Sequence, residues 1–581
     1  MGECSFEGSP VENGDCSFAE GCGTAANGDC SHAEGCGTEA NGNCSHAEGC
    51  CSVANGDCSH SEGSQTLANA IASHSEGSGT TASGDFSHAE GDSNTASGRA
   101  SHAEGAGNTA NGVASHAEGL LTVANEQGSH AEGVFSIADE FASRAEGFGT
   151  NASGESSHAE GNSTTASGDF SHAEGDSNTA SGDASHAEGE GNTASGRASH
   201  AEGGGEDQFG NFTPNLASGD SSHAEGAGTI ASGFTSHAEG FFTTASDFFS
   251  HAEGVETTAS GSASHAEGEG TIASNEASHA EGLSTTASGL FSHAEGNGTE
   301  ASGNISHAEG FITTASEFAS HAEGNQTLAN GALSHTEGFR KCANGLTGVH
   351  VMGQNGGPNP AVDLPFSWYL VNGAAQCDIT GVVAKILSNG SACFDSTVTA
   401  SSYITSAGAC DYAEMFETID GQPIDVGYFV TFDGASDKVT KANTNDDYIV
   451  GITSSRPGIL ADTQDPTCSK YLLDEWNREI YEEVVVEAIK DNEGNVIMPE
   501  RIETKKKLNP AWDPNISCSS RLTRPEWVAV GLVGKLLVRD DGTCQVGNYC
   551  KSNDEGIATA STNGYRVMKR TGPNQIMILV R

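Results

Sequence analysis

The chain is poor in basic residues, in aromatic residues and in long apolar stretches. Only 25 of its 581 residues are Lys or Arg against 79 Asp or Glu, and the net charge of −54 would repel both nucleic acid and an anionic membrane. Aromatic residues make up 6 % of the chain. No run of about 18 apolar residues occurs, so no transmembrane helix is expected. These shortages argue against a nucleic-acid partner and against membrane insertion.

The N-terminus, MGECSFEGSP, has neither a basic region nor an apolar core, so we expect no signal peptide and synthesis in the cytoplasm. The 17 cysteines would then begin as thiols. High acidity with few aromatic residues is also typical of disorder. A strict internal repeat argues against disorder here.

A 14-residue unit, S-H-A-E-G-x-x-T-x-A-S-G-x-x, runs through residues 1–340, and residues 157–170 show it plainly. A nine-residue insertion at 206–214 interrupts it once and is interpreted as a loop leaving a single coil. A short fixed period is typical of a solenoid. Because side chains alternate along a strand, we expect two short strands and two turns per coil. Ser, Ala and Gly of SHAEG, with Thr, Ala and Gly of the second strand, would fill the interior.

The His and Glu of the unit are predicted to line the axis between three chains. Twenty-one of the 22 His occupy the second position, and Glu fills the fourth from Glu20 to Glu337, whereas the residue between Thr and Ala varies. A solvated face would not be kept so constant across internal copies. The predicted column includes His158, Glu160, His172, Glu174, Arg144 and Glu146, with Arg144 in place of a His.

Stacked Glu residues about 4.8 Å apart need something to offset their repulsion. A His–Glu hydrogen-bonded network or metal ions held by His and carboxylate would do so. We favour the network, with no metal and no cofactor, because Arg144 cannot ligate a metal. Pairing predicts a raised His pKa and a lowered Glu pKa, and hence greatest stability in mildly acidic to neutral solution.

Cysteines concentrate in the first coils, at both ends of the predicted axis-facing strand. Two interpretations stay open: disulfides between chains, or small turn residues that stay reduced. In the first interpretation Cys16 of one chain would face Cys22 of the next. The residues concerned are Cys16, Cys30 and Cys44 before the Ser, and Cys22, Cys36 and Cys50 after the Gly.

The repeat resembles the head repeats of trimeric autotransporter adhesins, S-x-A-x-G-x-x-A-x-A-x-G-x-x, from residue 5 to about residue 340. The resemblance implies a left-handed parallel β-roll packed as a homotrimer. In that family the two x positions of S-x-A-x-G are typically apolar and face the trimer axis. His and Glu stand there in this chain, which replaces the usual dry interface with a polar one.

After residue 340 the composition changes. We expect a neck or linker β region at 341–409 and a separate α+β or β-rich domain at 410–581. The second contains strand-like runs at 428–432, 484–487, 528–538 and 575–580, a turn at 491–495 and a possible helix at 471–480.

This C-terminal part resembles the intramolecular-chaperone autoproteolytic domain, of glutamic-peptidase type, found in phage neck-appendage and Firmicute prophage proteins. The stretches that carry the resemblance are GACDYAEMFE (408–417), DDYIVGI (446–452), KYLLDEWNREIYEEV (470–484), RPEWVAVGLVGKLLVRDDGTC (524–544) and GYRVMKR (564–570). The resemblance implies a domain that holds three fibre ends together and then cuts itself off through acidic residues.

The acids that match are Asp411, Glu414 and Glu417, and we expect the scissile bond at Cys410–Asp411. Neighbouring carboxylates split their pKa values, so one can donate a proton while another activates water. Two alternatives stay open. The Cys410 thiol could attack its own preceding carbonyl, or DYAE could be a strand with solvated acids.

These features predict a tail-fibre or appendage protein of a phage or prophage, carried on a virion or phage-like particle. Its expected partners are two further copies, the phage tail or baseplate, and a host-surface glycan or receptor. A bacterial adhesin without enzymatic activity is the alternative, which the missing signal peptide disfavours. A glycan-degrading tailspike ranks last, because the acids of the repeat are periodic and form no paired site.

Overall fold

The computed structural model describes residues 8–396, 398, 410–465, 469–486, 488–490, 496–516 and 519–581. The chain divides into two compact units, Met1–Asn355 with Pro365–Trp368, and Gly356–Leu364 with Tyr369–Arg581. Strands make up nearly all the regular structure, and the helix found in the described ranges is a single 3-10 turn, Arg521–Thr523. None of the described helical structure is long and apolar enough to cross a membrane.

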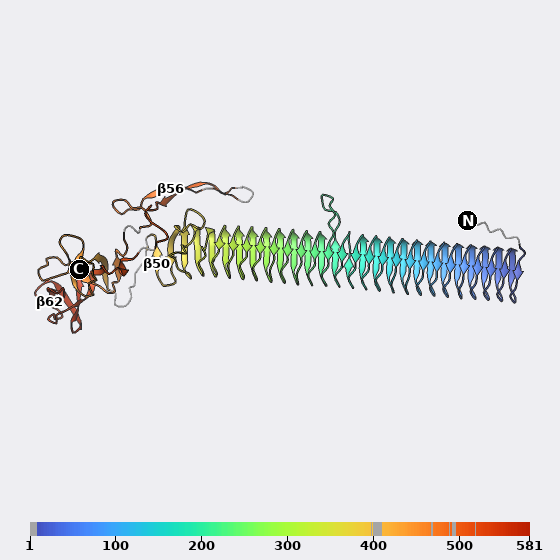
Figure 1. Ribbon diagram of the computed structural model, residues 1–581, viewed down its shortest axis with the longest axis horizontal. Helices are drawn as coiled ribbons and strands as arrows, with labels where there is room; N and C mark the ends of the chain where they lie inside the picture. Colours follow the sequence, from blue (N-terminus) through green and yellow to red (C-terminus); the bar gives the residue numbers. More distant parts are fainter. Residues whose placement is uncertain are drawn as a thin grey trace. The chain divides into compact units, whose positions relative to one another are not determined.

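The first unit is a parallel β-solenoid whose coils stack in a row (Figure 1). Each coil supplies a long strand that begins at the His and a two-residue strand that ends at an Ala, as in β22 (His158–Asn162) and β23 (Thr165–Ala166). Every strand pairs in register with its copy one coil on, so His158 lies beside His172 and Glu160 beside Glu174. The pattern runs from β2 (Phe18–Cys22) and β3 (Ala25–Ala26) to β44 (His321–Asn325) and β45 (Leu328–Ala329). The predicted solenoid is confirmed.

Small side chains fill the inside of each coil, as expected from the alternation. The Ser and Ala of SHAEG are buried, together with the Thr just before the short strand and the Ala that ends it, and Ala159, Thr164 and Ala166 are fully inaccessible. The Ser hydroxyl closes the turn before it, as when Ser115 donates to the carbonyl of Gly112 at 2.8 Å. Two facing strands this close leave no room for larger residues, so the coil buries little apolar surface per residue.

The Gly of SHAEG was expected inside the coil, and this expectation is wrong. Gly161 is exposed, because its φ of +103° turns the chain out of the regular alternation. A Cβ at Gly161 would lie 2.2 Å from the carbonyl oxygen of Gly175 in the next coil. Glycine is therefore required by the backbone approach between coils and not by interior packing. Ser163, two residues on, also has a positive φ (54°) but faces open space and tolerates a side chain.

Replacing Gly161 with Ala should destabilise the shaft by about 1–3 kcal/mol, because the new Cβ meets backbone at a conformation that side chains avoid. The matched control is Ser163→Ala, at a left-handed position that already carries a Cβ. Guanidinium unfolding followed by circular dichroism measures both variants. Equal midpoints for the two would contradict the assigned role of the glycine.

The stack continues one coil beyond residue 340, where the repeat was predicted to end. In β47 (His350–Gly356) the His350 ring lies 4.5 Å from that of His335 in β46 (His335–Lys341), so the last His belongs to the same column. Trp368 covers His350 edge-on at 5.3 Å. The motif is lost here because Met352 replaces the Glu, while the backbone path is kept.

The insertion leaves one coil as a loop, as predicted (Figure 1). His200 pairs directly with His223, so the stack is uninterrupted beneath the loop. Asp207 organises the loop by accepting hydrogen bonds from the backbone N–H groups of Phe209 and Asn211, both at 2.8 Å.

The second unit is built around one mainly antiparallel sheet, with its core at Phe429, Ile452, Leu536, Ile576 and Ile578. The order is β53-β52-β54-β60-β64-β63-β61-β62, and β51 pairs with β60 and β55. The bounds are β51 (Asp411–Glu417), β52 (Phe429–Phe432), β53 (Val439–Lys441), β54 (Gly451–Thr453), β55 (Ile459–Ala461), β60 (Trp527–Arg539), β61 (Tyr549–Ser552), β62 (Ala558–Ser561), β63 (Tyr565–Gly572) and β64 (Gln575–Val580). Outside that sheet lie β48 (Trp368–Asn372), β49 (Val382–Ile386), β50 (Ala392–Phe394) and the two-stranded pairs β56 (Tyr481–Val486) with β59 (Arg501–Lys506) and β57 (Ile489–Lys490) with β58 (Val496–Met498).

Strands β52, β60 and β64 confirm three of the predicted strand runs, and β56 covers the fourth as far as Val486. Glu487 and the turn predicted at 491–495 lie outside the described residues. The helix predicted at 471–480 is wrong. Asp474 accepts hydrogen bonds from the backbone N–H groups of Trp476 (2.8 Å) and Arg478 (2.9 Å), which closes a turn between bridged residues and leaves the domain β-rich.

Candidate functional site

The candidate scissile bond lies where the chain enters β51, and residues 399–409 before it are outside the described ranges. The carbonyl oxygen of Cys410 accepts a hydrogen bond from the backbone N–H of Lys535, with a donor–acceptor distance of 3.4 Å. Gly534 makes this approach possible, because a Cβ there would lie 2.4 Å from the same oxygen. The carbonyl expected to be attacked therefore faces a backbone donor on β60.

Asp411, directly after that carbonyl, is largely buried. Its Oδ2 is inaccessible and has no hydrogen-bond partner within the described part of the chain. The residue opens on a cavity of about 380 Å³ that Ser454, Ser455, Arg456 and Lys535 also line. A polar space of this size can hold water. Asp411 therefore lines a cavity that can hold water and directly follows the candidate scissile carbonyl.

The structure does not bring the three candidate acids together in one chain. Glu414 alternates to the opposite face of β51, where it accepts a hydrogen bond from the Tyr412 hydroxyl at 2.6 Å. Glu417 lies six residues, or about 20 Å, from Asp411 along the strand, and it pairs with Lys438 at 2.7 Å. Splitting of pKa values between neighbouring carboxyls therefore has no geometric basis within a single chain.

Sequence reasoning missed Gly534 and Lys535. The available signal was a glycine in the interior of a long apolar strand, which marks a bulge or a close backbone approach. Opposite β51 the strand does contain an irregularity, since Tyr412 pairs with Val533 and Ala413 with Gly531.

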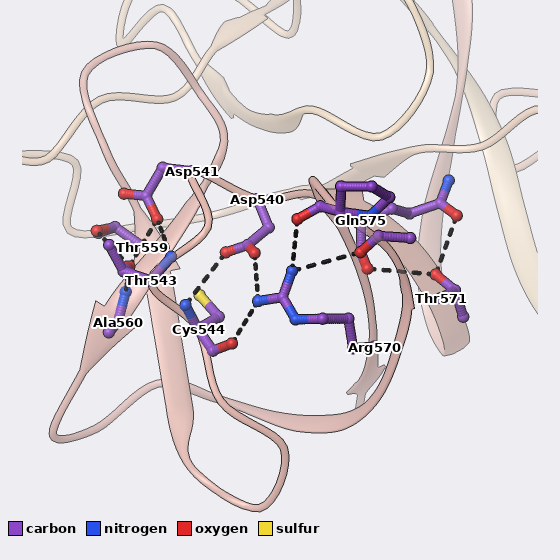
Figure 2. Close-up of polar contacts among 11 residues, drawn as sticks. Asp540, Asp541, Thr543, Cys544, Thr559, Ala560, Arg570, Thr571 and Gln575 are labelled. Atoms are coloured by element: carbon purple, nitrogen blue, oxygen red, sulfur yellow. Dashed lines mark hydrogen bonds and ion pairs between the residues drawn. The ribbon is translucent and has the colours of Figure 1, made fainter.

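Two stretches that carry the family resemblance meet in a buried ion pair (Figure 2). Arg570, from GYRVMKR, binds the fully buried carboxylate of Asp540, from the RDDGTC end of β60, at 2.6 Å. The same guanidinium donates to the backbone carbonyl of Cys544, whose N–H donates back to Asp540 at 3.3 Å. Removing one partner of such a pair costs about 3–5 kcal/mol. These residues hold the domain together and lie outside the cleavage region.

The His and Glu residues of the repeat form two continuous columns on one half-exposed face of the shaft. Neighbouring imidazoles stack, as His158 on His172 with 4.7 Å between ring centroids and 3° between planes. His Nε2 atoms lie close to Glu carboxylates, for example 3.5 Å between His158 and Glu160. Arg144 interrupts the stack and pairs with Glu146.

The expected rise in the His pKa is reversed, while the expected fall in the Glu pKa is found at some carboxyls and reversed at others. Burial, followed by repulsion from the next imidazole, lowers the pKa of His60 and of His74. Hydrogen bonds to Glu90 and Glu118, with burial, raise the pKa of Glu104 to about 7, while the hydrogen bond from Glu104 lowers the pKa of Glu90. Burial of the imidazoles and hydrogen bonds between stacked carboxyls therefore outweigh the His–Glu pairing, and neighbouring carboxyls share protons.

Groups such as His60, Glu62 and His74 bring three potential metal ligands within 4.8 Å of one another. The two imidazole rings are nearly parallel, with 2° between their planes, so their lone pairs run side by side and do not converge on one point. A preformed tetrahedral site needs converging ligands. The columns of a single chain therefore favour proton sharing over metal binding.

The cysteines of the first coils lie at both ends of the long strand, as predicted. Cys16, Cys30 and Cys44 occupy the exposed turn before the Ser, at φ values of 58–60°, and Cys22, Cys36 and Cys50 end the long strands. Cys51 is disulfide-bonded, which sequence reasoning did not anticipate.

Glu104→Gln should stabilise the shaft in alkaline solution. A carboxyl whose folded pKa is raised from 4.5 to about 7 stabilises the fold below 4.5, and that contribution is lost as the pH rises through about 7. Gln cannot ionise and keeps a hydrogen-bond donor in the column. The unfolding midpoint of the variant should therefore exceed that of the parent near pH 8 and differ less near pH 5.

The matched control for this prediction is Glu155→Gln, at an exposed turn outside the column. It removes the same charge without touching the carboxyl column. If both variants shift the midpoint equally at each pH, the carboxyls of the column do not share protons.

The fold defines a repetitive β-solenoid shaft and a separate β-rich C-terminal domain. Residues 367–575 match the Peptidase_G2 family, described as the IMC autoproteolytic cleavage domain, and the C-terminal part is a domain of this family. The pre-neck appendage protein of Bacillus phage B103 is 34 % identical over 206 residues, covering 35 % of this chain and 22 % of that protein. The pre-neck appendage protein of Bacillus phage phi29 is 32 % identical over 180 residues (29 % and 19 %), and the putative phage-related protein YobO of Bacillus subtilis (strain 168) is 35 % identical over 164 residues (28 % and 19 %).

The matched region spans about a fifth of the length of these relatives. Among solved structures, the C-terminal fragment of gene product 12 of bacteriophage phi29 is 30 % identical, with a TM-score of 0.25, and the match covers 29 % of this chain and 100 % of that one. A TM-score this low adds nothing to the description of the fold.

Proposed function

We propose that the chain is a structural protein of a phage or prophage tail fibre or appendage. Three copies assemble through the C-terminal domain, which afterwards releases itself by self-cleavage. The observation that carries the proposal is the junction of an in-register β-solenoid with a domain of an autoproteolytic family found in phage appendage proteins. Such a protein belongs on a virion or phage-like particle, in contact with the tail or baseplate.

The shaft by itself supports assembly with further copies. Its interior is almost entirely Ala, Ser and Thr, so each coil buries little apolar surface. The His/Glu face, half-exposed in one chain, would be enclosed in a homotrimer. A solenoid with so small a core gains most of its missing burial from lateral partners.

The cleavage step uses groups that lie together at the start of β51. The Asp411 carboxylate takes a proton from a water in the adjoining cavity, and the water oxygen attacks the carbonyl carbon of Cys410. The N–H of Lys535 stabilises the resulting oxyanion, and the bond to the Asp411 nitrogen breaks as that nitrogen takes a proton. Cys410 would then end the shaft fragment. Glu414 remains a candidate for acting on a neighbouring chain of the trimer, whereas Glu417 is paired with Lys438.

Asp411→Asn should slow self-cleavage by at least about 100-fold, because it removes the general base. Gly534→Ala should also block cleavage by displacing the Cys410 carbonyl from its donor. Intact-mass measurement of purified protein over time follows the appearance of fragments ending at Cys410 and starting at Asp411.

The control is Glu417→Gln, which should cleave normally because Glu417 is tied to Lys438. Cys410→Ser separates the two chemistries: cleavage persists if Asp411 activates water and is lost if the thiol attacks the preceding carbonyl. Wild-type protein that stays intact after assembly contradicts the proposal.

Because the coils are nearly identical, the three chains need a separate domain to set their register. A slip of one coil between chains changes few contacts, since each coil resembles the next. Fixing three chains at one end before the shafts pair would set a single register. The family match supports this role for the C-terminal domain.

A chain ending at Ala409 should therefore aggregate or assemble out of register, whereas the shaft released from the full chain should be a stable trimer. Arg570→Met in the full chain should reproduce the defect, because it breaks the buried pair with Asp540. Light scattering and negative-stain microscopy distinguish uniform trimers from misaligned ones. Uniform trimers from the truncated chain would count against a chaperone role.

A host-surface glycan or receptor is the remaining expected partner. The loop at 206–214 is our candidate for that contact, since Phe209 is 78 % and Phe212 54 % exposed. The turn at Asp207 holds the backbone N–H of Phe209, which carries the more exposed of the two rings.

A further inference from the structure

Two edges of the shaft flank the long strand of every coil. The leading edge consists of the two residues after the Gly of SHAEG, where the long strand ends, and the trailing edge of the two residues before the Ser, just ahead of that strand. In one coil, Phe241 and Phe242 form the leading edge and Phe234 and Thr235 the trailing edge. The strand between them spans about 17 Å, so the two edges of one coil do not reach each other.

Exposed apolar side chains gather on these edges. Phe148 and Phe242 on the leading edge are 54 % and 45 % exposed, and Phe141 and Phe249 on the trailing edge are 47 % and 58 % exposed. Between the edges the long strand presents mainly His and Glu of the repeat, with Phe18 and Arg144 at two of the His positions. On the opposite face of the coils the large exposed apolar side chains are few, such as Ile230 and Ile272. Apolar surface in two lines beside one polar face marks an interaction surface.

The phenylalanines contact neighbours along their own edge. The ring centroids of Phe234 and Phe249 lie 5.8 Å apart on the trailing edge, and those of Phe241 and Phe242 lie 4.4 Å apart on the leading edge. These contacts leave the rings substantially exposed. Burying them requires surface from another molecule.

The cysteines indicate which surface that is. Within the repeat, thiols stand on both edges of the same first coils, Cys16 and Cys30 on the trailing edge and Cys22 and Cys36 on the leading edge. The densest phenylalanines also occupy both edges at one level, in residues 234–249. The two edges therefore carry the same residue types at the same level. Because the two edges of one chain cannot meet, we expect each edge to contact the matching edge of another chain.

We propose that the leading edge of each copy packs against the trailing edge of the next copy at the same level. Two different edges make a head-to-tail contact, which closes into a ring under rotational symmetry. The three long strands then form the sides of a triangle and enclose the His/Glu columns. This arrangement rests on the proposed trimer and adds to it the residues that join the chains.

Paired cysteines at matching levels test the arrangement. The variant Phe242→Cys/Phe234→Cys should give a covalent trimer on a non-reducing denaturing gel, with the linked peptide identified by mass spectrometry. Either single substitution should give no new link, because each edge meets the opposite edge and not its own copy. A second pair, Asp92→Cys/Asp85→Cys, places the same test at exposed polar residues whose replacement leaves the fold intact.

A displaced pair serves as the matched control. Phe242→Cys/Phe318→Cys uses the same two edges six coils apart, about 29 Å along the stack, and should not link. The parent chain gives the background from native cysteines. Links in the displaced pair, or in either single variant, would overturn the edge-to-edge arrangement.

Light scattering on the same samples separates this proposal from the trimer itself. A trimer in which neither paired variant links retains the proposed function and refutes the edge contacts. A monomer refutes both. Linked trimers from both pairs, with none from the controls, support both.

Discussion

Residues of the repeat lie beside the equivalent residue of the next coil, and this in-register stacking limits which side chains each position can hold. A residue type suits a position only if its side chain packs well against the same side chain in the adjacent coil. Ala and Ser do so inside the coil, and Asn does so at the turns, where Asn13 donates to Asn27 at 2.6 Å. Imidazoles do so by parallel stacking. Glutamates lack that option as anions, so the carboxyls of the column share protons. Hydrogen bonds between neighbours raise the pKa of Glu104 and lower that of Glu90.

The same constraint explains the weakness of the shaft as a single chain and its dependence on lateral contacts. Stacking satisfies the backbone completely but leaves apolar side chains at the turns with nothing to cover them, as at Phe249. Arg144, the loop at 206–214 and the last His, His350, are the main departures from uniformity along the stack. They are too sparse to fix a register between chains by themselves, which gives a separate assembly domain a physical purpose.

In the C-terminal domain the candidate scissile carbonyl is contacted by a backbone group, while the candidate acids are dispersed along β51. The acids that the sequence groups together are spread over both faces of β51. What lies at the Cys410 carbonyl is an N–H from Lys535, admitted by the lack of a side chain at Gly534. A sheet that pairs the first strand of the domain with its longest one therefore positions the bond expected to break.

The sequence alone determined the solenoid, because a 14-residue period with alternating small residues permits few other folds, and it identified the C-terminal family through stretches such as GYRVMKR. It also located the His/Glu columns and both cysteine edges. It could not give the exposure of Gly161, the turn at Asp474 or the placement of Glu414 away from Asp411, since each depends on backbone torsion or strand pairing that no local pattern encodes. The sign of the pKa shifts was likewise decided by tertiary structure. His and Glu do lie close together in the stack, with 3.5 Å between His158 and Glu160, but burial of the imidazoles and hydrogen bonds between stacked carboxyls outweigh that pairing.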